Sequence, residues 1–254
     1  MREPEVVVLP DSAAVAAEAA ARTADVCGRA AASRGACALA LSGGETPKPL
    51  YALLAAEPYR SRIPWGRVEV FWGDERCVPP DDPRSNYRLA HDLLLSKVPL
   101  PAGQIHRMPG DTRDHAAAAN AYAETLRRRL PATADGWPRF DLILLGIGDN
   151  AHTASLFPRS AALRERARAV VAEYVESAKM WRMTLTVPVL THAVEVVFMV
   201  SGAAKAPAVR AALEEPPNDE VPAAFIRPAD GRVTWLLDSA AAADLTRYGR
   251  SGRA

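Results

Sequence analysis

The segment at residues 140–158, FDLILLGIGDNAHTASLFP, holds the strongest candidate for chemistry in this chain. Its apolar run at residues 141–145 is typical of a buried strand, and two glycines then lead into a polar cluster that contains His152. Ligands bind at the carboxyl ends of the strands in an open parallel sheet, because glycine-rich turns and helix N-termini direct backbone N–H groups there. His152 is therefore a candidate general base. The alternative is that it only caps a short helix.

The glycine turn at residues 42–46, SGGET, has the features of a phosphate site. Between Ser42 and Thr46, Gly43 and Gly44 let the backbone approach an anion, and the proline that follows suits the first turn of a helix with its positive end toward that anion. The pattern is not a Walker loop, so it does not indicate a nucleoside triphosphate. The alternative is an ordinary turn between a strand and a helix.

Two more polar groups follow predicted strands. Asp74 and Arg76 come directly after the apolar run at residues 68–72, and Lys205 lies four residues after Ser201, where a later run ends. Each has an ordinary explanation, a solvated ion pair in the first case and a surface lysine in the second. Because polar clusters end several apolar strands at the same predicted sheet edge, we favour a functional role for Asp74 and Arg76. For Lys205 both a surface position and a second phosphate contact stay open.

The elements that must position these groups form a regular alternation. Helical patterns begin at Asp11 or Ser12, after Pro47, at Ser85 and at Asp238, and they also cover residues 111–130 and 203–213. Apolar or β-branched runs predict strands at residues 6–9, 37–41, 68–72, 141–145, 170–175, 183–189, 194–200 and 233–237. The alternation predicts a single α/β domain, residues 1–254, with one mainly parallel sheet covered by helices on both faces.

Composition, net charge and cysteine content indicate which class of protein this is and which partners to expect. Of the 254 residues, 49% are hydrophobic and 24% charged, as in ordinary globular proteins. Thirty-one basic and thirty acidic residues leave a formal charge of +1, so neither nucleic acid nor a membrane is expected as a partner. The three cysteines lack a C-x-x-C pair, which indicates free thiols and a cytoplasmic location.

The chain also lacks several motifs of other reactions. We find no H-E-x-x-H motif, no G-x-S-x-G elbow and no complete dinucleotide fingerprint in GIGD. We therefore expect a small-molecule substrate with neither metal nor cofactor. The oligomeric state stays open, with a monomer favoured.

Several motifs together resemble the 6-phosphogluconolactonase family of the pentose phosphate pathway. They are SGGETPKPLY at 42–51, GDERCVP with SNY at 73–87, LGIGDNAHTASLFP at 145–158, VSGAAKA at 200–206, PAAFIRP at 222–228 and VTWLLDSAAA at 233–242. Their order and spacing span nearly the whole chain. The resemblance implies a modified doubly wound α/β fold, shared with glucosamine-6-phosphate deaminases, and hydrolysis of 6-phospho-glucono-1,5-lactone to 6-phosphogluconate.

The resemblance also implies roles for individual residues. His152 would be the base that activates water, and Arg76 would face the substrate, with Asp74 orienting it or the water. The 6-phosphate would be held by Ser42, Gly43, Gly44, Thr46, Arg182 and Lys205.

One position departs from the family pattern. Where the family typically has Asp-Gly-His, this chain has Asn150, Ala151 and His152. An aspartate there would orient the imidazole and stabilise its charged form, whereas an amide can form a hydrogen bond but supplies no charge. Asp149 is a second candidate for the orienting role.

Two other functions remain as alternatives. An amino-sugar phosphate deaminase or isomerase on the same fold is disfavoured, because its expected extra glutamate is absent between Ser155 and Pro158. A non-catalytic sugar-phosphate-binding domain of a transcriptional regulator would normally carry a DNA-binding module, and the first strand near Val6 leaves no room for one.

Overall fold

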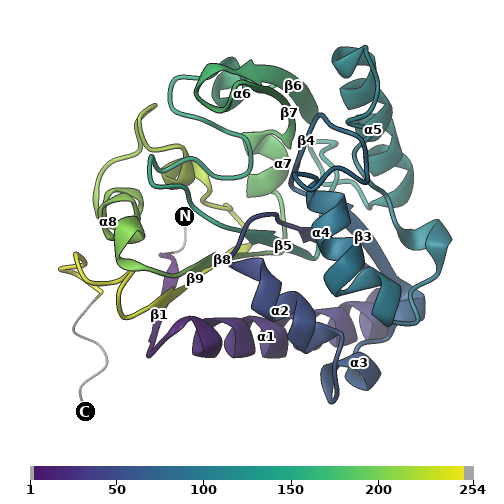
Figure 1. Ribbon diagram of the computed structural model, residues 1–254, viewed down its shortest axis with the longest axis horizontal. Coiled ribbons are helices and arrows are strands. Elements are labelled where there is room, and N and C mark those ends of the chain that lie inside the picture. The colour runs from purple at the N-terminus through teal and green to yellow at the C-terminus, as the bar shows by residue number, and fades with distance from the viewer. Residues whose placement is uncertain (1–2, 249–254) are drawn as a thin grey trace.

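A six-stranded parallel sheet forms the centre of the protein, in the strand order β1-β9-β8-β5-β2-β3 (Figure 1). The computed structural model describes residues 3–248. The strands of this sheet are β1 (Glu5–Leu9), β2 (Cys37–Leu41), β3 (Val68–Trp72), β5 (Leu142–Leu145), β8 (Glu195–Val200) and β9 (Arg232–Asp238). The predicted α/β fold with a mainly parallel sheet is therefore confirmed.

Eight α-helices of the described residues connect or flank the strands. They are α1 (Ser12–Arg34), α2 (Pro47–Leu54), α3 (Tyr59–Arg62), α4 (Asn86–Leu93), α5 (His115–Arg129), α6 (Ala161–Arg164), α7 (Val187–Thr191) and α8 (Ala206–Glu214). In Figure 1, α1 and α2 lie below the main sheet, whereas α6 and a second, small sheet lie above it. Within residues 3–248, no helix has the length and apolar character needed to cross a membrane.

Helix α1 begins and ends at residues that suit those positions. The Asp11 side chain accepts a hydrogen bond from the Ala14 N–H at 2.8 Å, and Gly35 ends the helix at φ 81°, a conformation that favours glycine. Ala16, Ala19 and Ala20 are buried, and side chains this small let the helix approach the sheet closely.

Strand β5 lies inside the main sheet and carries the polar segment that follows it. Its four residues, LILL, are all buried. Asp141, just before the strand, accepts a hydrogen bond from the Ala38 N–H at 2.8 Å and forms an ion pair with Arg34. These contacts tie the start of β5 to neighbouring β2.

The second sheet is a difference from the sequence-based expectation of one sheet. It is antiparallel, in the order β4-β7-β6, with β4 (Asp74–Arg76), β6 (Val170–Val175) and β7 (Met180–Leu185). Gly73 joins the two sheets, because its N–H donates to the Leu41 carbonyl and its carbonyl accepts from the Leu185 N–H, both at 2.9 Å. The polar segment after β3 is thus a short strand rather than a loop.

Two predicted boundaries and one predicted helix were wrong. The strand expected at residues 183–189 begins earlier, at Met180, and ends at Leu185, because Pro188 lies in the first turn of α7. The helix expected at residues 111–130 begins at His115, with Asp114 as its cap. No helix begins at Asp238, since the described residues that follow, 239–244, form turns.

The parallel order brings four polar segments to one edge. Strands β8, β5, β2 and β3 are consecutive neighbours and run in the same direction. The segments that follow them therefore start at the same edge of the sheet. In open α/β sheets, ligands bind in a crevice at this carboxyl edge. This edge is where the candidate site residues lie.

We predict that Leu144→Ala destabilises the protein far more than Val8→Ala. Leu144 is fully buried in β5, whereas Val8 is 43% exposed on the edge strand β1. Truncating a buried leucine costs about 2–5 kcal/mol of unfolding free energy, and an exposed valine should cost less than about 1 kcal/mol. Urea denaturation followed by tryptophan fluorescence measures both. Equal shifts of the two midpoints would contradict this placement of the core.

Candidate active site

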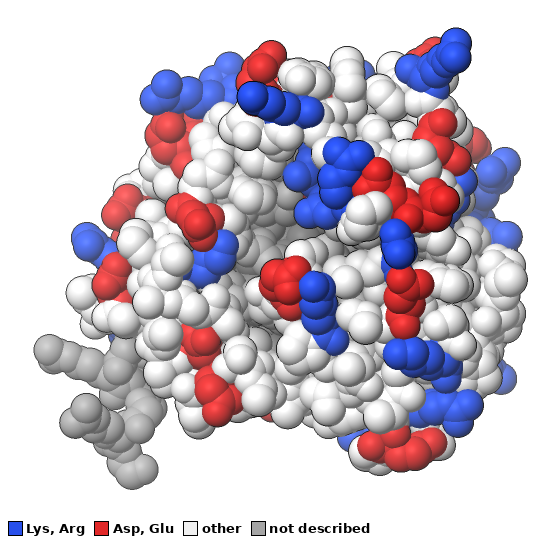
Figure 2. Space-filling model, viewed as in Figure 1, with Lys and Arg blue, Asp and Glu red and all other residues white. Residues whose placement is uncertain are grey.

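A cavity of about 440 Å³ opens at the carboxyl edge of the main sheet. Nine of the ten residues predicted for the site line it: Ser42, Gly43, Gly44, Thr46, Asp74, Arg76, His152, Arg182 and Lys205. The tenth, Asn150, contacts His152 and so lies next to the cavity wall. Figure 2 shows a hollow near the middle of this face, with basic side chains at its rim.

The Asn150 side chain orients His152. Asn150 Oδ1 lies 2.6 Å from His152 Nδ1 and also accepts the backbone N–H of His152, at 3.3 Å. An atom that accepts a backbone N–H is an oxygen, so Nδ1 must be the donor in the shorter contact. The neutral imidazole then carries its proton on Nδ1, which leaves the lone pair of Nε2 free to accept a proton.

The backbone around His152 is a tight turn. Ala151 has φ 62°, the Gly148 N–H donates to the His152 carbonyl at 2.9 Å, and the Ala151 N–H donates to the Gly148 carbonyl at 2.9 Å. A Cβ atom at Gly148 would lie 2.0 Å from His152 Nδ1, so only glycine fits there. Phe157 stacks on the imidazole, with ring centroids 4.4 Å apart and planes 15° apart. The ring is thus held from two sides.

Burial lowers the pKa of His152 from its usual value. The positive charges of Arg182 and Lys205 lower it further, while the negative charges of Asp74 and Asp149 oppose them. A lowered pKa keeps the imidazole neutral at neutral pH, and only the neutral form can act as a base.

Asp74 is buried and held by several donors. Its Oδ2 accepts the Ser155 hydroxyl at 2.6 Å, its Oδ1 accepts Asn86 Nδ2 at 3.2 Å, and Arg182 Nη1 lies 3.8 Å from Oδ2. A carboxylate engaged in this way is a fixed negative charge beside the imidazole. Ser155 is buried, and its hydroxyl is engaged by Asp74.

Two guanidinium groups lie opposite each other in the small sheet. Arg76 of β4 pairs in register with Arg182 of β7, and both line the cavity. Like charges at directly opposite positions repel each other, and the positive charge of Arg76 lowers the pKa of Arg182 after burial, the larger cause. An anion bound in the cavity would relieve this repulsion.

The glycine turn lies close to Asn86, at the start of α4. A Cβ atom at Gly43 would lie 1.7 Å from Asn86 Oδ1, and Gly44 has φ 95°. Thr46 lies at the N-cap of α2, with Pro47 at the first helical position. The turn therefore places backbone N–H groups and the positive end of a helix at the cavity.

Lys205 lies on the opposite wall, just before α8. Its Nζ forms an ion pair with Asp149 Oδ1 at 2.5 Å. Asp149 was considered as an orienting partner of His152, but in the structure its side chain binds Lys205 and Asn150 contacts the imidazole.

Unpartnered polar atoms concentrate in this cavity. Among the described residues, eight side chains have a buried nitrogen or oxygen atom without a hydrogen-bond partner, and five of these residues line it: Ser42, Arg76, Asn86, Arg182 and Ser201. Buried polar atoms are nearly always paired in folded proteins, so such a concentration indicates a polar ligand.

Sequence reasoning gave no role to Asn86, Glu75 or Ser201. Glu75 is buried and accepts the backbone N–H groups of Asn86 and Tyr87 at 2.7 and 2.8 Å, which fixes the start of α4 against β4. Burial raises the pKa of Glu75, and the hydrogen bonds oppose this. The signal for these residues was present in GDERC, SNY and VSGAAKA, but contacts between separate segments cannot be read from a motif.

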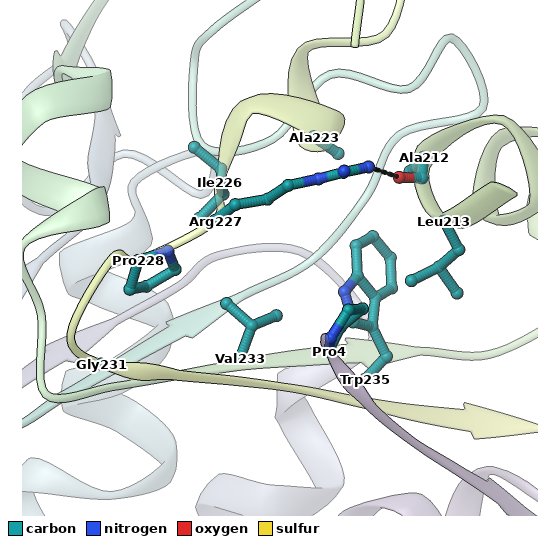
Figure 3. A pocket seen from close by; sticks show the side chains of 10 residues that line it. All are labelled: Pro4, Ala212, Leu213, Ala223, Ile226, Arg227, Pro228, Gly231, Val233 and Trp235. Carbon is teal, nitrogen blue, oxygen red and sulfur yellow. Dashed lines mark hydrogen bonds between the residues drawn. The ribbon is translucent and has the colours of Figure 1, made fainter. Parts of the chain in front are cut away.

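A second hollow lies between α8 and β9 (Figure 3). Its volume is about 20 Å³, and its lining includes the apolar side chains of Val233 and Trp235. Arg227 extends across it, and its Nη2 donates to the Ala212 carbonyl at 3.3 Å. The space suits about one water molecule and is too small for a sugar phosphate.

No metal-binding cluster was found in the part of the chain that the structure describes. Between residues 3 and 248, no three His, Cys, Asp or Glu side chains are grouped so that they could hold an ion. The charged residues that line the cavity are three cations, Arg76, Arg182 and Lys205, and two carboxylates, Glu45 and Asp74, so the lining carries a small excess of positive charge that would favour an anion.

Comparison with known proteins places the chain among sugar-phosphate enzymes. The family model described as "Glucosamine-6-phosphate isomerases/6-phosphogluconolactonase" matches residues 10–235. A 6-phosphogluconolactonase of Nostoc sp. is 40% identical over 243 residues, which cover 95% of this chain and 98% of that protein. The solved structure of 6-phosphogluconolactonase from Trypanosoma brucei superposes with a TM-score of 0.86 at 29% identity, covering 97% of this chain and all of that one.

A monomeric glucosamine-6-phosphate deaminase has the same fold. It superposes with a TM-score of 0.79 at 22% identity, and the match covers 95% of this chain and all of that one. At this identity the likeness concerns the fold alone.

We predict that Gly148→Ala displaces the His152 ring, whereas Gly146→Ala does not. The new Cβ would overlap His152 Nδ1 at position 148, but at position 146 its nearest neighbour is the Met199 carbonyl, 3.9 Å away. The His152 ring resonances in a ¹H–¹³C NMR spectrum should move strongly in the first variant only. Unchanged resonances in Gly148→Ala would show that the turn does not hold the imidazole.

Proposed function

The chain belongs to the glucosamine-6-phosphate isomerase/6-phosphogluconolactonase family, and we propose that it hydrolyses 6-phospho-D-glucono-1,5-lactone to 6-phosphogluconate in the oxidative pentose phosphate pathway. The observation that best supports this reaction is the hydrogen bond from His152 Nδ1 to Asn150 Oδ1 beside a basic cavity. It leaves a neutral imidazole with a free Nε2 lone pair where an anionic substrate would bind.

His152 acts first as a base and then as an acid. Nε2 takes a proton from a water molecule while the water oxygen attacks C1 of the lactone, and the carbonyl electron pair moves to the carbonyl oxygen. When the bond between C1 and the ring oxygen breaks, Nε2 returns the proton to that oxygen, which becomes the C5 hydroxyl. The new carboxylic acid ionises at neutral pH. Such acid–base help is worth about 10²–10⁴ in rate.

The cations and the glycine turn share the negative charges of the substrate. We assign the 6-phosphate to the turn at residues 42–46, to Arg182 and to Lys205, because these groups line the cavity and supply N–H donors. Arg76 faces the substrate and stabilises negative charge that develops on the carbonyl oxygen. Asp74 pairs with Arg182 and supplies a negative charge that stabilises the imidazolium formed during the reaction.

The Asn150-Ala151-His152 sequence gives the base an unusual environment for this family. An aspartate at position 150 would stabilise imidazolium, whereas the amide holds the ring without that charge. Ala151 also adopts φ 62°, a conformation that the family's glycine accepts with less strain. The expected result is a weaker base that stays neutral, and therefore active, at lower pH.

We predict that His152→Ala lowers turnover by a factor of about 10²–10⁴, because the general base is lost. The control variant His91→Ala, at an exposed histidine, should leave turnover unaltered. The assay is acid release from freshly generated 6-phosphogluconolactone, with spontaneous hydrolysis subtracted. Ammonia release from glucosamine-6-phosphate, measured beside it, should stay at background. Near-normal lactone turnover in His152→Ala, or rapid ammonia release, would sink the proposed reaction.

We predict that Asn150→Asp moves the acid limb of the pH–rate profile to higher pH. A carboxylate beside Nδ1 favours imidazolium and raises the pKa of His152, so more alkaline conditions are needed to free the base. The matched change Asn218→Asp, at an exposed residue whose side chain does not contact His152, should leave the limb in place. If both variants keep the wild-type profile, Asn150 and His152 are not coupled.

A further inference from the structure

We propose that Asp149 is an internal substitute for the substrate's phosphate: it holds Lys205 in the free site, and the phosphate displaces it on binding. The proposal rests on the assignment of Lys205 to the phosphate. It gives Asp149 a role in positioning Lys205 and in setting the affinity for phosphate.

The geometry of the free site supports the exchange. Lys205 Nζ and Asp149 Oδ1 are 2.5 Å apart, within range of a charge-assisted hydrogen bond. This bond lowers the pKa of Asp149, as expected for a carboxylate that is ionised beside the ammonium. Lys205 is also the lysine that lines the cavity, whereas Asp149 lies outside the lining.

The backbone before Lys205 is firmly held, so the lysine stays where the phosphate must bind. Gly202, at φ 99°, donates its N–H to both carboxylate oxygens of Asp238 at 3.1 and 3.0 Å. The Lys205 N–H donates in turn to the Gly202 carbonyl at 3.0 Å. The Lys205 side chain is only 26% exposed.

The Asp149 side chain, in contrast, can move away from Lys205 at a small cost in free energy. Its side chain is 71% exposed, and it lies in the turn that also carries Asn150. Ion pairs between exposed groups contribute little to stability, because water solvates the separated charges well. The Asp149 carboxylate can therefore turn into solvent when a stronger anion arrives.

Competition between the two anions favours phosphate. A phosphate group near neutral pH carries up to two negative charges and three acceptor oxygens, whereas the carboxylate carries one charge. A neutral sugar lactone has no anion to exchange and would leave the ion pair intact. The pair therefore keeps Lys205 in place in the free site, weakens phosphate binding by the cost of the exchange, and forms again when the product leaves.

The test is the binding of inorganic phosphate by titration calorimetry to the wild type, Asp149→Asn, Lys205→Met and the double variant. Asp149→Asn should bind phosphate about three- to fivefold more tightly, since the competing ion pair is gone. In the Lys205→Met background the same change should alter affinity by less than about 1.5-fold. Circular dichroism confirms that each variant is folded.

Glu124→Gln is the matched control. Glu124 pairs with Arg127 at 2.6 Å and does not line the cavity, so this change removes an equal charge without touching Lys205 or the phosphate site. It should change phosphate affinity by less than about 1.5-fold, because its side chain is 50% exposed and its charge is screened.

Three outcomes would overturn the proposal: equal or weaker phosphate binding in Asp149→Asn, the same gain in the Lys205→Met background, or no phosphate binding by any of the proteins. The readout uses no lactone. A protein that shows the exchange but does not hydrolyse 6-phosphogluconolactone would instead reject the proposed function and leave this inference standing.

Discussion

The hydrogen bond between His152 Nδ1 and Asn150 Oδ1 is the contact on which the proposed chemistry depends. It decides which ring nitrogen keeps its proton and which is free to act. The bond forms within a turn of a few residues, but it needs a glycine at position 148 to leave room for the ring, and it needs β5 to deliver that turn to the sheet edge. The buried core of the sheet and the orientation of one imidazole are thus parts of the same arrangement.

The charged side chains of the cavity differ in the partners that surround them. Asp74 is surrounded by donors and is a fixed charge, whereas Arg76 and Arg182 repel each other across two paired strands. Lys205 has a partner of its own in Asp149. A bound phosphorylated ligand would relieve the repulsion between Arg76 and Arg182 and would replace Asp149 as the partner of Lys205. The free site therefore has cations available for an anionic ligand.

Local patterns were enough to predict most of this arrangement. The β5 run, the glycine turn and His152 each carry a short-range signal, and parallel topology then brings them to one edge. The small antiparallel sheet could not be predicted, because the pairing of β4 with β7 depends on contacts between segments about a hundred residues apart. The roles of Glu75 and Asn86 were missed because their contact joins two separate segments, although these are only 11 residues apart in the sequence. The helix at Val187 was missed because its β-branched residues favour a strand. Pro188, in the first turn of the helix, favours a helix start instead.

The tautomer of His152 in the wild-type protein tests the central claim most directly. Two-dimensional ¹H–¹⁵N NMR of the protein with labelled histidine distinguishes a protonated ring nitrogen from a bare one. The structure predicts a neutral ring at pH 7, protonated on Nδ1 and bare on Nε2, because Asn150 Oδ1 accepts from Nδ1 and burial lowers the pKa. An imidazolium at pH 7, or a ring protonated on Nε2, would contradict the account.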